Sequence, residues 1–393
     1  MDAVFAPASA DAAIISQMAW ALIAGAALIF GGVMLLMALG LRRRGGSGGE
    51  GGEGGQGGQA RRRLRPGLWI LGGGLLLPAA VLSALMAYNV RRSTQLDPQT
   101  SRGALVVAVT AKMWWWEVRY RDPAGGQDIV LANEIHLPVG RPVYLALTSA
   151  DVIHSFWVPA LGGKMDMVPG RMTGLSLRPL KPGVYRGQCA EYCGLQHARM
   201  ALHVVVEPAA GFDAWLAQQA RPEPLPAAAP DARLAAGRRV FEQHCAACHA
   251  VRTTAAPVAA AAISPPAAAP AATAEPTATG GPPATAAPAA PAAPVAPPAT
   301  AAPAATAASD AAAATAAGAP LAAPLKLTSV GPDLTHVASR LYLAAGTLRN
   351  QPGALAAWVA DPHAHKPGVR MPAASALSPD ELQALSAYLE NLK

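Results

Sequence analysis

The sequence predicts a multidomain chain made of a two-helix transmembrane hairpin, an all-β domain and a small all-α domain. Two long apolar segments within the first 91 residues predict the hairpin. Short runs rich in Val, Leu and Ile, separated by Pro and Gly, follow up to residue 208 and predict strands. Helical periodicity returns after residue 230 and again at the C-terminus.

The composition excludes a uniform soluble protein. Only 14% of the 393 residues are charged and 52% are apolar, whereas soluble domains usually contain about 25% charged residues. Seven arginines lie between residues 42 and 65, where only two glutamates offset them. The net charge of +7 is therefore mostly a local feature, and a nucleic-acid-binding face on a folded module is not indicated.

Residues 12–41 and 66–90 are predicted to cross a membrane. The first run has only Ser16 and Gln17 as clearly polar members, and a spanning helix needs about twenty apolar residues. A signal peptide would have a basic start and a shorter apolar core, so we expect a retained helix. The second run contains few polar residues, and Pro78 is expected to kink it.

The arginine-rich loop between these helices predicts their orientation. Short loops rich in Lys and Arg stay on the cytoplasmic side, so both termini are expected outside. A polybasic localisation patch is the alternative, but the flanking helices already account for the arginines. The predicted divisions are 1–41 for the N-terminus and first helix, 42–65 for the loop, 66–91 for the second helix, 92–208 for the β domain, 209–230 for a linker and 231–393 for the α domain.

Four runs of the β domain have clear strand character, at residues 104–110, 129–131, 143–148 and 201–206. Turns rich in Pro and Gly separate them. Strands of this length and spacing are typical of a β-sandwich or barrel.

A cluster of soft metal ligands stands near the end of the β domain. Cys189 and Cys193 are followed by His197 and Met200, and His154 adds an imidazole from a distant loop. Thiolate, imidazole and thioether together favour copper over hard cations. Because a mononuclear blue-copper site uses one cysteine, the second allows two thiolates to bridge two copper ions. A zinc site and a disulfide between the cysteines are the alternatives.

A second motif, Cys245-Ala-Ala-Cys248-His249, follows a predicted helix that Asp231 caps. C-x-x-C-H is typical of covalently attached c-type haem, in which two thioethers fix the porphyrin and the imidazole binds the iron. A thioredoxin-like pair would need a βαβ context, and a zinc knuckle would need another Cys/His pair nearby. The sequence offers neither, so the motif predicts a haem domain.

Met371 is expected to be the second axial ligand of the haem. It is the only methionine after Met200, and a thioether opposite a histidine raises the haem potential. His363 and His365 lie nearby and are the competing ligands.

A low-complexity segment, residues 251–327, interrupts the haem domain and consists almost wholly of Ala, Pro and Thr. Such a composition cannot bury a core and predicts disorder or partly extended polyproline II structure. Closing a long loop costs little extra entropy, so the fold need not be interrupted. After it, Ser378 and Glu381 form a predicted capping box at the start of the last helix.

These motifs resemble those of subunit II of cytochrome c oxidase. The string Cys-Ala-Glu-x-Cys-Gly-x-x-His-x-x-Met at 189–200, the sequence His154-Ser-Phe and the aromatic run that begins at Trp114 are similar to that family. The segments 331–340, 358–362 and the Met371-Pro pair resemble the class I cytochrome c domain fused to subunit II in caa-type oxidases. The 251–327 insert is the main departure from that cytochrome c domain, which has only a short loop at this place.

The resemblance implies a cupredoxin-like barrel that holds CuA, a binuclear mixed-valence copper centre. By the family pattern, the ligands are the bridging Cys189 and Cys193, the terminal His154 and His197, Met200 and the backbone carbonyl of Glu191. The Glu191 carboxylate would also reach a magnesium ion shared with subunit I. Trp114 stands where the family has its electron-accepting tryptophan, and Pro332 is expected to pack near His249.

The resemblance also implies a function for the whole chain. It would accept electrons from cytochrome c, or from a quinol-oxidising complex, through its haem and copper and pass them to subunit I. There oxygen reduction is coupled to proton translocation, with subunit III as a further partner. A bacterial plasma membrane is the expected location, with the copper and haem domains outside. The alternatives are a CuA-containing subunit of a nitric oxide reductase and a membrane-tethered copper chaperone, which would need a thioredoxin-like βαβ pattern.

Overall fold

The computed structural model describes residues 5–45, 66–96, 103–223, 231–253 and 330–393. Most of the basic loop and nearly all of the low-complexity insert lie outside the described residues. The predictions for the side of the membrane on which the loop lies and for disorder in the insert therefore stay predictions.

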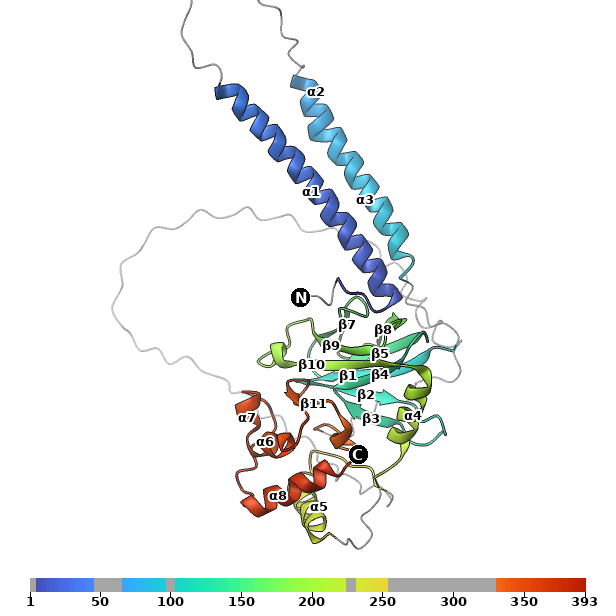
Figure 1. Cartoon of the computed structure of the whole chain (residues 1–393), viewed down its shortest axis with the longest axis vertical. Coiled ribbons are helices and arrows are strands. Elements are labelled where there is room, and N and C mark those ends of the chain that lie inside the picture. The colour runs from blue at the N-terminus through green and yellow to red at the C-terminus, as the bar shows by residue number, and fades with distance from the viewer. Residues whose placement is uncertain (1–4, 46–65, 97–102, 224–230, 254–329) are drawn as a thin grey trace, which may run out of the picture. The chain divides into compact units, whose positions relative to one another are not determined.

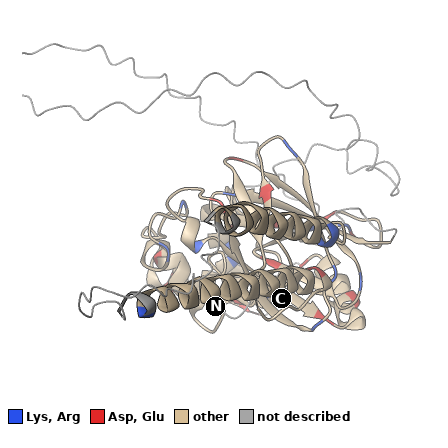
Figure 2. Cartoon of the chain, turned by 90° about the horizontal axis from the view of Figure 1, so that it is seen from above, with Lys and Arg blue, Asp and Glu red and all other residues tan. Residues whose placement is uncertain are grey.

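Two apolar helical segments follow the N-terminus (Figure 1). The first is α1 (Ala10–Gly45); the second runs through α2 (Pro66–Leu71), the π-helical turn η1 (Gly72–Leu76) and α3 (Leu77–Ser93). The stretches Ala10–Arg42 and Gly72–Ser93 within them are long and apolar enough to cross a membrane, with mean hydropathies of 2.5 and 1.6. Figure 2 shows them almost free of charged residues except near their ends.

The irregularity expected at Pro78 lies just before it. The π-helical turn spans residues 72–76, and Pro78 occupies the first turn of α3. Proline has no backbone N–H, so one hydrogen bond is missing from the continuous helical segment at Pro78. The distortion in this segment is thus at three consecutive glycines, which have low helix propensity.

The middle of the chain is a β-sandwich of two five-stranded sheets. One sheet has the order β3-β2-β1-β5-β8 and the other β4-β10-β9-β6-β7. The strands are β1 (Leu105–Lys112), β2 (Trp115–Tyr120), β3 (Ile129–Ala132), β4 (Glu134–Pro138), β5 (Val143–Ser149), β6 (His154–Trp157), β7 (Met165–Met167), β8 (Thr173–Leu177), β9 (Gly183–Cys189) and β10 (Ala201–Glu207). Pairs β1–β5 and β4–β10 are parallel, and the other pairs are antiparallel.

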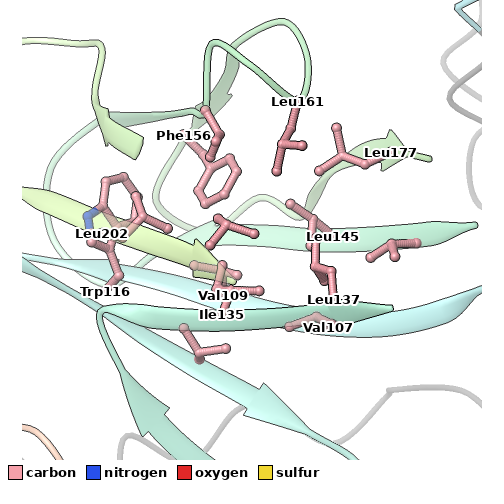
Figure 3. Packing of buried hydrophobic residues seen from close by; sticks show 14 of the residues in the cluster. Val107, Val109, Trp116, Ile135, Leu137, Leu145, Phe156, Leu161, Leu177 and Leu202 are labelled. Atoms are coloured by element: carbon pink, nitrogen blue, oxygen red, sulfur yellow. The ribbon is translucent and has the colours of Figure 1, made fainter. Parts of the chain in front are cut away.

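Apolar side chains from both sheets fill the sandwich (Figure 3). Val109 and Leu145 come from one sheet, and Ile135 and Leu202 from the other; each is fully buried. Trp116 meets Phe156 edge to face, with ring centroids 5.8 Å apart, a favourable aromatic geometry. This core confirms the predicted all-β domain, and of the two predicted forms, sandwich and barrel, the structure has two packed sheets.

Helix α4 (Ala209–Ala220) replaces the first part of the predicted 209–230 linker. Its Phe212 is fully buried and belongs to the apolar core of the sandwich. Trp215 stacks on His136 of β4, with ring centroids 3.9 Å apart. The helix is therefore an integral part of the β domain.

The C-terminal part of the chain is mainly helical. It contains α5 (Ala232–His244), α6 (Ala354–Ala360), α7 (Pro362–His365), α8 (Pro379–Glu390), a short turn η4 (Val337–Ser339) and the small hairpin of β11 (Tyr342–Leu343) and β12 (Leu348–Arg349). Helices α5 and α8 cross closely at Gly237, where a Cβ atom would come within 2.0 Å of the carbonyl oxygen of Ala384. Only glycine permits this approach.

Both predicted helix starts of this part are confirmed. The side chain of Asp231 accepts a hydrogen bond from the backbone N–H of Arg233, at 2.9 Å. Ser378 and Glu381 form a complete capping box at the start of α8. These caps satisfy backbone donors that the helices themselves leave without acceptors.

Candidate metal centre and haem-binding motif

Three strand ends bring the predicted copper ligands together. Strand β9 lies between β10 and β6 in its sheet. His154 begins β6, Cys189 ends β9, and the antiparallel register pairs Phe156 with Cys189. The loop from β9 to β10 then returns past Cys193 and the short 3₁₀ turn η2 (His197–Arg199). Residues far apart in sequence therefore meet where these three neighbouring strands begin or end.

The ligand atoms form a compact, buried cluster. The two cysteine Sγ atoms lie 3.8 Å apart. The Nδ1 atom of His154 lies 3.8 Å from the Sγ of Cys189, and that of His197 lies 3.7 Å from the Sγ of Cys193. The Sδ of Met200 is 3.9 Å from the Sγ of Cys193. Each thiol thus has one imidazole beside it.

This geometry fits bound metal and excludes the disulfide alternative. A disulfide needs sulfurs about 2.05 Å apart, whereas both cysteines here are unpaired. Half of the 3.8 Å sulfur separation is shorter than a metal–thiolate bond of about 2.3 Å, so one ion can contact both sulfurs. His154, Cys189 and Cys193 have ligand atoms within 4.8 Å of one another. The residues therefore fit a thiolate-bridged centre.

Glu191 contributes differently through its backbone and its side chain. Its carbonyl oxygen lies 3.1 Å from the Sγ of Cys189, close enough to belong to the same cluster. Glu191 itself is exposed. Among the described residues, its carboxylate makes no hydrogen bond to a ligand atom of the cluster. Only the carbonyl is brought to the cluster in this chain.

Contact between the two thiols makes them titrate very differently. The hydrogen bond from Cys193 lowers the pKa of Cys189, and the same contact raises the pKa of Cys193. Two neighbouring thiolates repel each other, so the second deprotonation is unfavourable without a cation. A metal ion between the sulfurs supplies that positive charge.

Asp151 is a site residue that sequence analysis missed. Its carboxylate accepts a hydrogen bond from the Nε2 of His154 at 2.8 Å and from the backbone N–H of Met113 at 2.6 Å. A proton on Nε2 leaves the Nδ1 lone pair directed toward Cys189, as a metal ligand requires. Its position three residues before His154 in the sequence was the available signal.

The structure distinguishes the three consecutive tryptophans. Trp116 is fully buried in the sandwich core, and Trp115 packs with Ala132 and Ala345 in a small separate cluster. Trp114 is partly buried, and its indole Nε1 donates to the carbonyl oxygen of Cys193 at 2.8 Å. Trp116 also meets a predicted copper ligand, the His154 ring, edge to face with centroids 6.3 Å apart. Among the described residues, Trp114 alone of the three hydrogen-bonds to a predicted copper ligand. Its role in electron transfer stays a prediction.

The haem motif follows α5 directly. Cys245 is the C-cap of this helix and is partly buried, and Cys248 is exposed. The backbone N–H of His249 donates to the carbonyl oxygen of Cys245 at 2.9 Å. Both cysteine side chains therefore stand on one tight turn beside the imidazole, which fits a porphyrin attached through two thioethers.

His249 is oriented by the segment after the insert. Its Nδ1 lies 2.7 Å from the carbonyl oxygen of Pro332, which confirms the expected contact and leaves Nε2 for iron. A Cβ atom on Gly331 would come within 2.6 Å of the ring, so the imidazole closely abuts this backbone. Burial lowers the pKa of His249 and favours the neutral imidazole that binds metals.

Met371 and Cys245 pack against the same apolar cluster of the helical part, which includes Phe241 and Leu385. The competing His363 and His365 are exposed. The structure thus places Met371 among the residues that surround the motif, and its role as an axial ligand stays a prediction.

Comparisons with known proteins match both parts of the chain. Residues 121–208 match the family described as cytochrome c oxidase subunit II, periplasmic domain, and residues 234–393 match the cytochrome c family. These matches agree with the predicted fold class, in which a cupredoxin-like domain precedes a cytochrome c domain. All predicted copper ligands fall in the first match and all predicted haem ligands in the second.

Two individual proteins similar to this chain are both named as subunit 2 of a cytochrome c oxidase. Cytochrome c oxidase subunit 2 of Alkalihalophilus pseudofirmus is 28% identical over 298 residues, which cover 76% of this chain and 64% of that protein. Alternative cytochrome c oxidase subunit 2 of Bradyrhizobium diazoefficiens is 46% identical over 99 residues, or 25% of this chain and 36% of that protein. The chain thus spans between about a third and two thirds of the length of these relatives.

A solved structure, the periplasmic domain of subunit II of cytochrome oxidase from Bradyrhizobium japonicum, is 32% identical to the part of this chain that it matches. It covers 30% of this chain and 95% of its own, with a TM-score of 0.28.

The predicted copper ligands lie on a β-sandwich. The copper-chaperone alternative required a thioredoxin-like βαβ unit, and the ten strands of this domain form none among the described residues. That alternative is therefore not supported.

Proposed function

We propose that this chain, which belongs to the cytochrome c oxidase subunit II family and ends in a cytochrome c domain, is the electron-input subunit of a membrane-bound terminal oxidase. One observation carries the proposal: two buried cysteines 3.8 Å apart, each beside one imidazole, share a chain with a C-x-x-C-H motif. Copper and haem c follow from the two domain families. An electron relay is the function that uses both.

The metal centre is proposed to be binuclear. Cys189 and Cys193 would bridge two copper ions, with His154 and His197 as terminal ligands and Met200 and the carbonyl of Glu191 completing the set. Such a pair supplies a one-electron relay whose bonds change little on reduction. The protein keeps water away, since His154 is 0% and Met200 1% exposed. Asp151 fixes the imidazole of His154 through its hydrogen bond.

The exposed carboxylate of Glu191 is proposed to bind a magnesium ion at the contact with subunit I. Carboxylate oxygens are the ligands that magnesium prefers. The exposure of this residue supports the proposal, because a carboxylate that serves a shared ion must be accessible to the partner subunit.

The haem is proposed to be held by Cys245, Cys248 and His249, with Met371 as the second axial ligand. Pro332 supports this by fixing the imidazole of His249 through its carbonyl oxygen. Electrons from cytochrome c, or from a quinol-oxidising complex, would enter at the haem and leave from the copper centre toward haem in subunit I. Oxygen reduction and proton translocation would occur in that partner, with subunit III as a further component.

The two apolar helices support a membrane location. We propose that they anchor the chain in a bacterial plasma membrane with both redox domains on the outer side. A cytoplasmic position of the arginine-rich loop, as short cationic loops prefer, agrees with this orientation.

The test is turnover of the purified complex that contains this chain. With reduced cytochrome c as donor we expect oxygen consumption, and Cys193→Ser should abolish it while the haem can still be reduced. The same preparation supplied with nitric oxide separates the oxidase from the nitric oxide reductase alternative. Consumption of nitric oxide without consumption of oxygen would contradict the proposal.

A further inference from the structure

A buried lysine of the cytochrome c domain contacts the tryptophan that lies beside the copper ligands. Lys366 is only 2% exposed, and its Nζ donates a hydrogen bond to the backbone carbonyl oxygen of Trp114 at 2.9 Å. Burial lowers the pKa of Lys366 to about 8. Burying the charge of a lysine is unfavourable unless the ammonium group has a hydrogen-bond partner. Here the carbonyl oxygen of Trp114 is such a partner.

Arg370 reaches the same tryptophan from the same segment. Its guanidinium group lies over the Trp114 ring, 5.5 Å from the centroid, a distance typical of a cation–π contact. Arg370 directly precedes Met371, the proposed axial ligand of the haem. The indole Nε1 of Trp114 in turn donates a hydrogen bond to the carbonyl oxygen of Cys193. A short chain of contacts therefore connects the two predicted metal sites.

A second set of contacts joins the same two parts of the chain around the β11–β12 hairpin. The carboxylate of Glu134 accepts from the backbone N–H of Leu341 at 2.8 Å. The backbone N–H of Ala201 donates to the carbonyl oxygen of Ala345 at 3.0 Å.

Two features of this second set show how closely the surfaces fit. His203 stacks on Tyr342 with ring centroids 3.7 Å apart and planes at 6°. Gly346 has a φ of +76°, and a Cβ there would lie 3.1 Å from Ala201. The surfaces are thus complementary in shape and in hydrogen bonding, as expected of a specific contact.

We infer that Lys366 and Arg370 are positioning residues: through their contacts with Trp114 they hold the cytochrome c domain so that its haem lies beside the copper centre. The inference deepens the proposed function and rests on it. One electron is lost by the haem and gained by the copper centre, with no bond formed or broken.

The first test needs no copper and no turnover. Hydrogen–deuterium exchange is measured on the full haem-loaded chain in detergent, before copper is added. In the wild type we expect slow exchange at the amides of Ala201 and Leu341, which donate across the contact. The Lys366→Met/Arg370→Met double variant should exchange at least ten-fold faster there.

The matched control for this test is Lys164→Met, which removes an exposed lysine of the β domain. It should leave the exchange pattern unchanged. Fast exchange at Ala201 and Leu341 in the wild type would overturn the inference. So would an unchanged pattern in the double variant.

The second test follows the order of reduction by stopped flow in the copper-loaded complex. With external reduced cytochrome c, the wild type should reduce its haem first and its copper centre after a lag. The double variant should reduce its haem at the wild-type rate, while transfer from haem to copper slows at least ten-fold. A merely structural defect would instead change both rates or the haem spectrum.

The outcomes separate the two proposals. Copper reduced without a lag, while the haem is still oxidised, would overturn the positioning roles of Lys366 and Arg370 and leave the proposed function intact. Absence of the copper centre or of a low-spin haem from a folded wild type would overturn the proposed function itself.

Discussion

The indole nitrogen of Trp114 donates a hydrogen bond to the backbone carbonyl oxygen of Cys193 across 2.8 Å. The next residue, Gly194, has a φ of +106°, and a Cβ there would lie 3.3 Å from the ring. Glycine is the residue that most readily adopts this conformation. The local backbone thus brings a partly exposed aromatic ring against a predicted copper ligand.

Trp114→Phe keeps an aromatic ring and removes the Nε1 donor. We expect electron transfer into the copper centre to slow by roughly ten-fold, which corresponds to about 1.4 kcal/mol of activation free energy. The absorption spectrum of the centre should not change. Stopped-flow reduction measures the rate, and Trp215→Phe, which alters the ring stacked on His136, is the control. An unchanged rate in Trp114→Phe would contradict the assigned role.

Asp151→Asn weakens the acceptor that orients His154. Loss of an outer partner of a metal-binding histidine typically lowers metal affinity about 10–100-fold, and we expect an effect in this range. Copper titration followed by visible absorption measures it. Asp166→Asn, at an exposed position of β7, should bind copper as the wild type does. Equal affinities in both variants would show that the carboxylate of Asp151 does not act on the site.

Gly331→Ala introduces a Cβ atom within 2.6 Å of the His249 ring. Because overpacking typically costs about 1–3 kcal/mol, either the imidazole or the backbone of residues 331–332 must move. We expect a loss of low-spin haem absorption and a lower unfolding temperature of the haem domain. A variant with the wild-type spectrum and stability would show that the imidazole does not lie against Gly331.

Stability of the cytochrome c domain is expected to depend on His336, whose Nδ1 lies 3.0 Å from the carboxylate of Glu223. Burial alone would lower the pKa of His336, but the adjacent Glu223 carboxylate and hydrogen bonding to backbone carbonyl groups outweigh burial and raise it above 6.5. The folded protein therefore binds this proton more tightly than the unfolded chain does. The stabilisation is complete below pH 6.5 and is lost as the pH rises through the raised value.

Denaturant unfolding of the full chain, followed by haem absorption at several pH values, measures this effect. The free energy of unfolding should fall above pH 6.5 in the wild type, and Glu223→Gln should flatten that dependence. Glu242→Gln removes an exposed helical ion pair with Arg238 and is the control. A fall of equal size in Glu223→Gln and the wild type would contradict the assignment.

The sequence was informative where the signal is local. The helical hairpin follows from two continuous apolar runs, and the Ser378 capping box follows from two residues three apart. The copper and haem ligands could be predicted because cysteine, histidine and methionine at these spacings are typical of copper and c-type haem sites. The all-β domain could be predicted from four strand-like runs, which correspond to β1, β3, β5 and β10. The other six strands of this domain, from the three-residue β7 to the seven-residue β9, lack a clear apolar run in the sequence.

The contacts that could not be predicted join residues far apart in the sequence. Lys366 meets Trp114 across 252 positions, and nothing local to either residue indicates the other. The alanines and prolines around α4 predict a linker over residues 209–230, whereas Phe212 and Leu216 of this helix are buried in the core of the sandwich. The role of Asp151 depends on the orientation of a ring, which sequence spacing alone does not reveal.

The central claim is that two thiolates bridge two copper ions in a chain that also holds haem c. Electron paramagnetic resonance of the oxidised, copper-loaded full chain in detergent tests it most directly. We predict a hyperfine pattern from one electron shared by two copper nuclei, beside a low-spin haem signal, and Cys193→Ser should remove only the first. A single-copper pattern, or zinc bound in place of copper, would contradict the account.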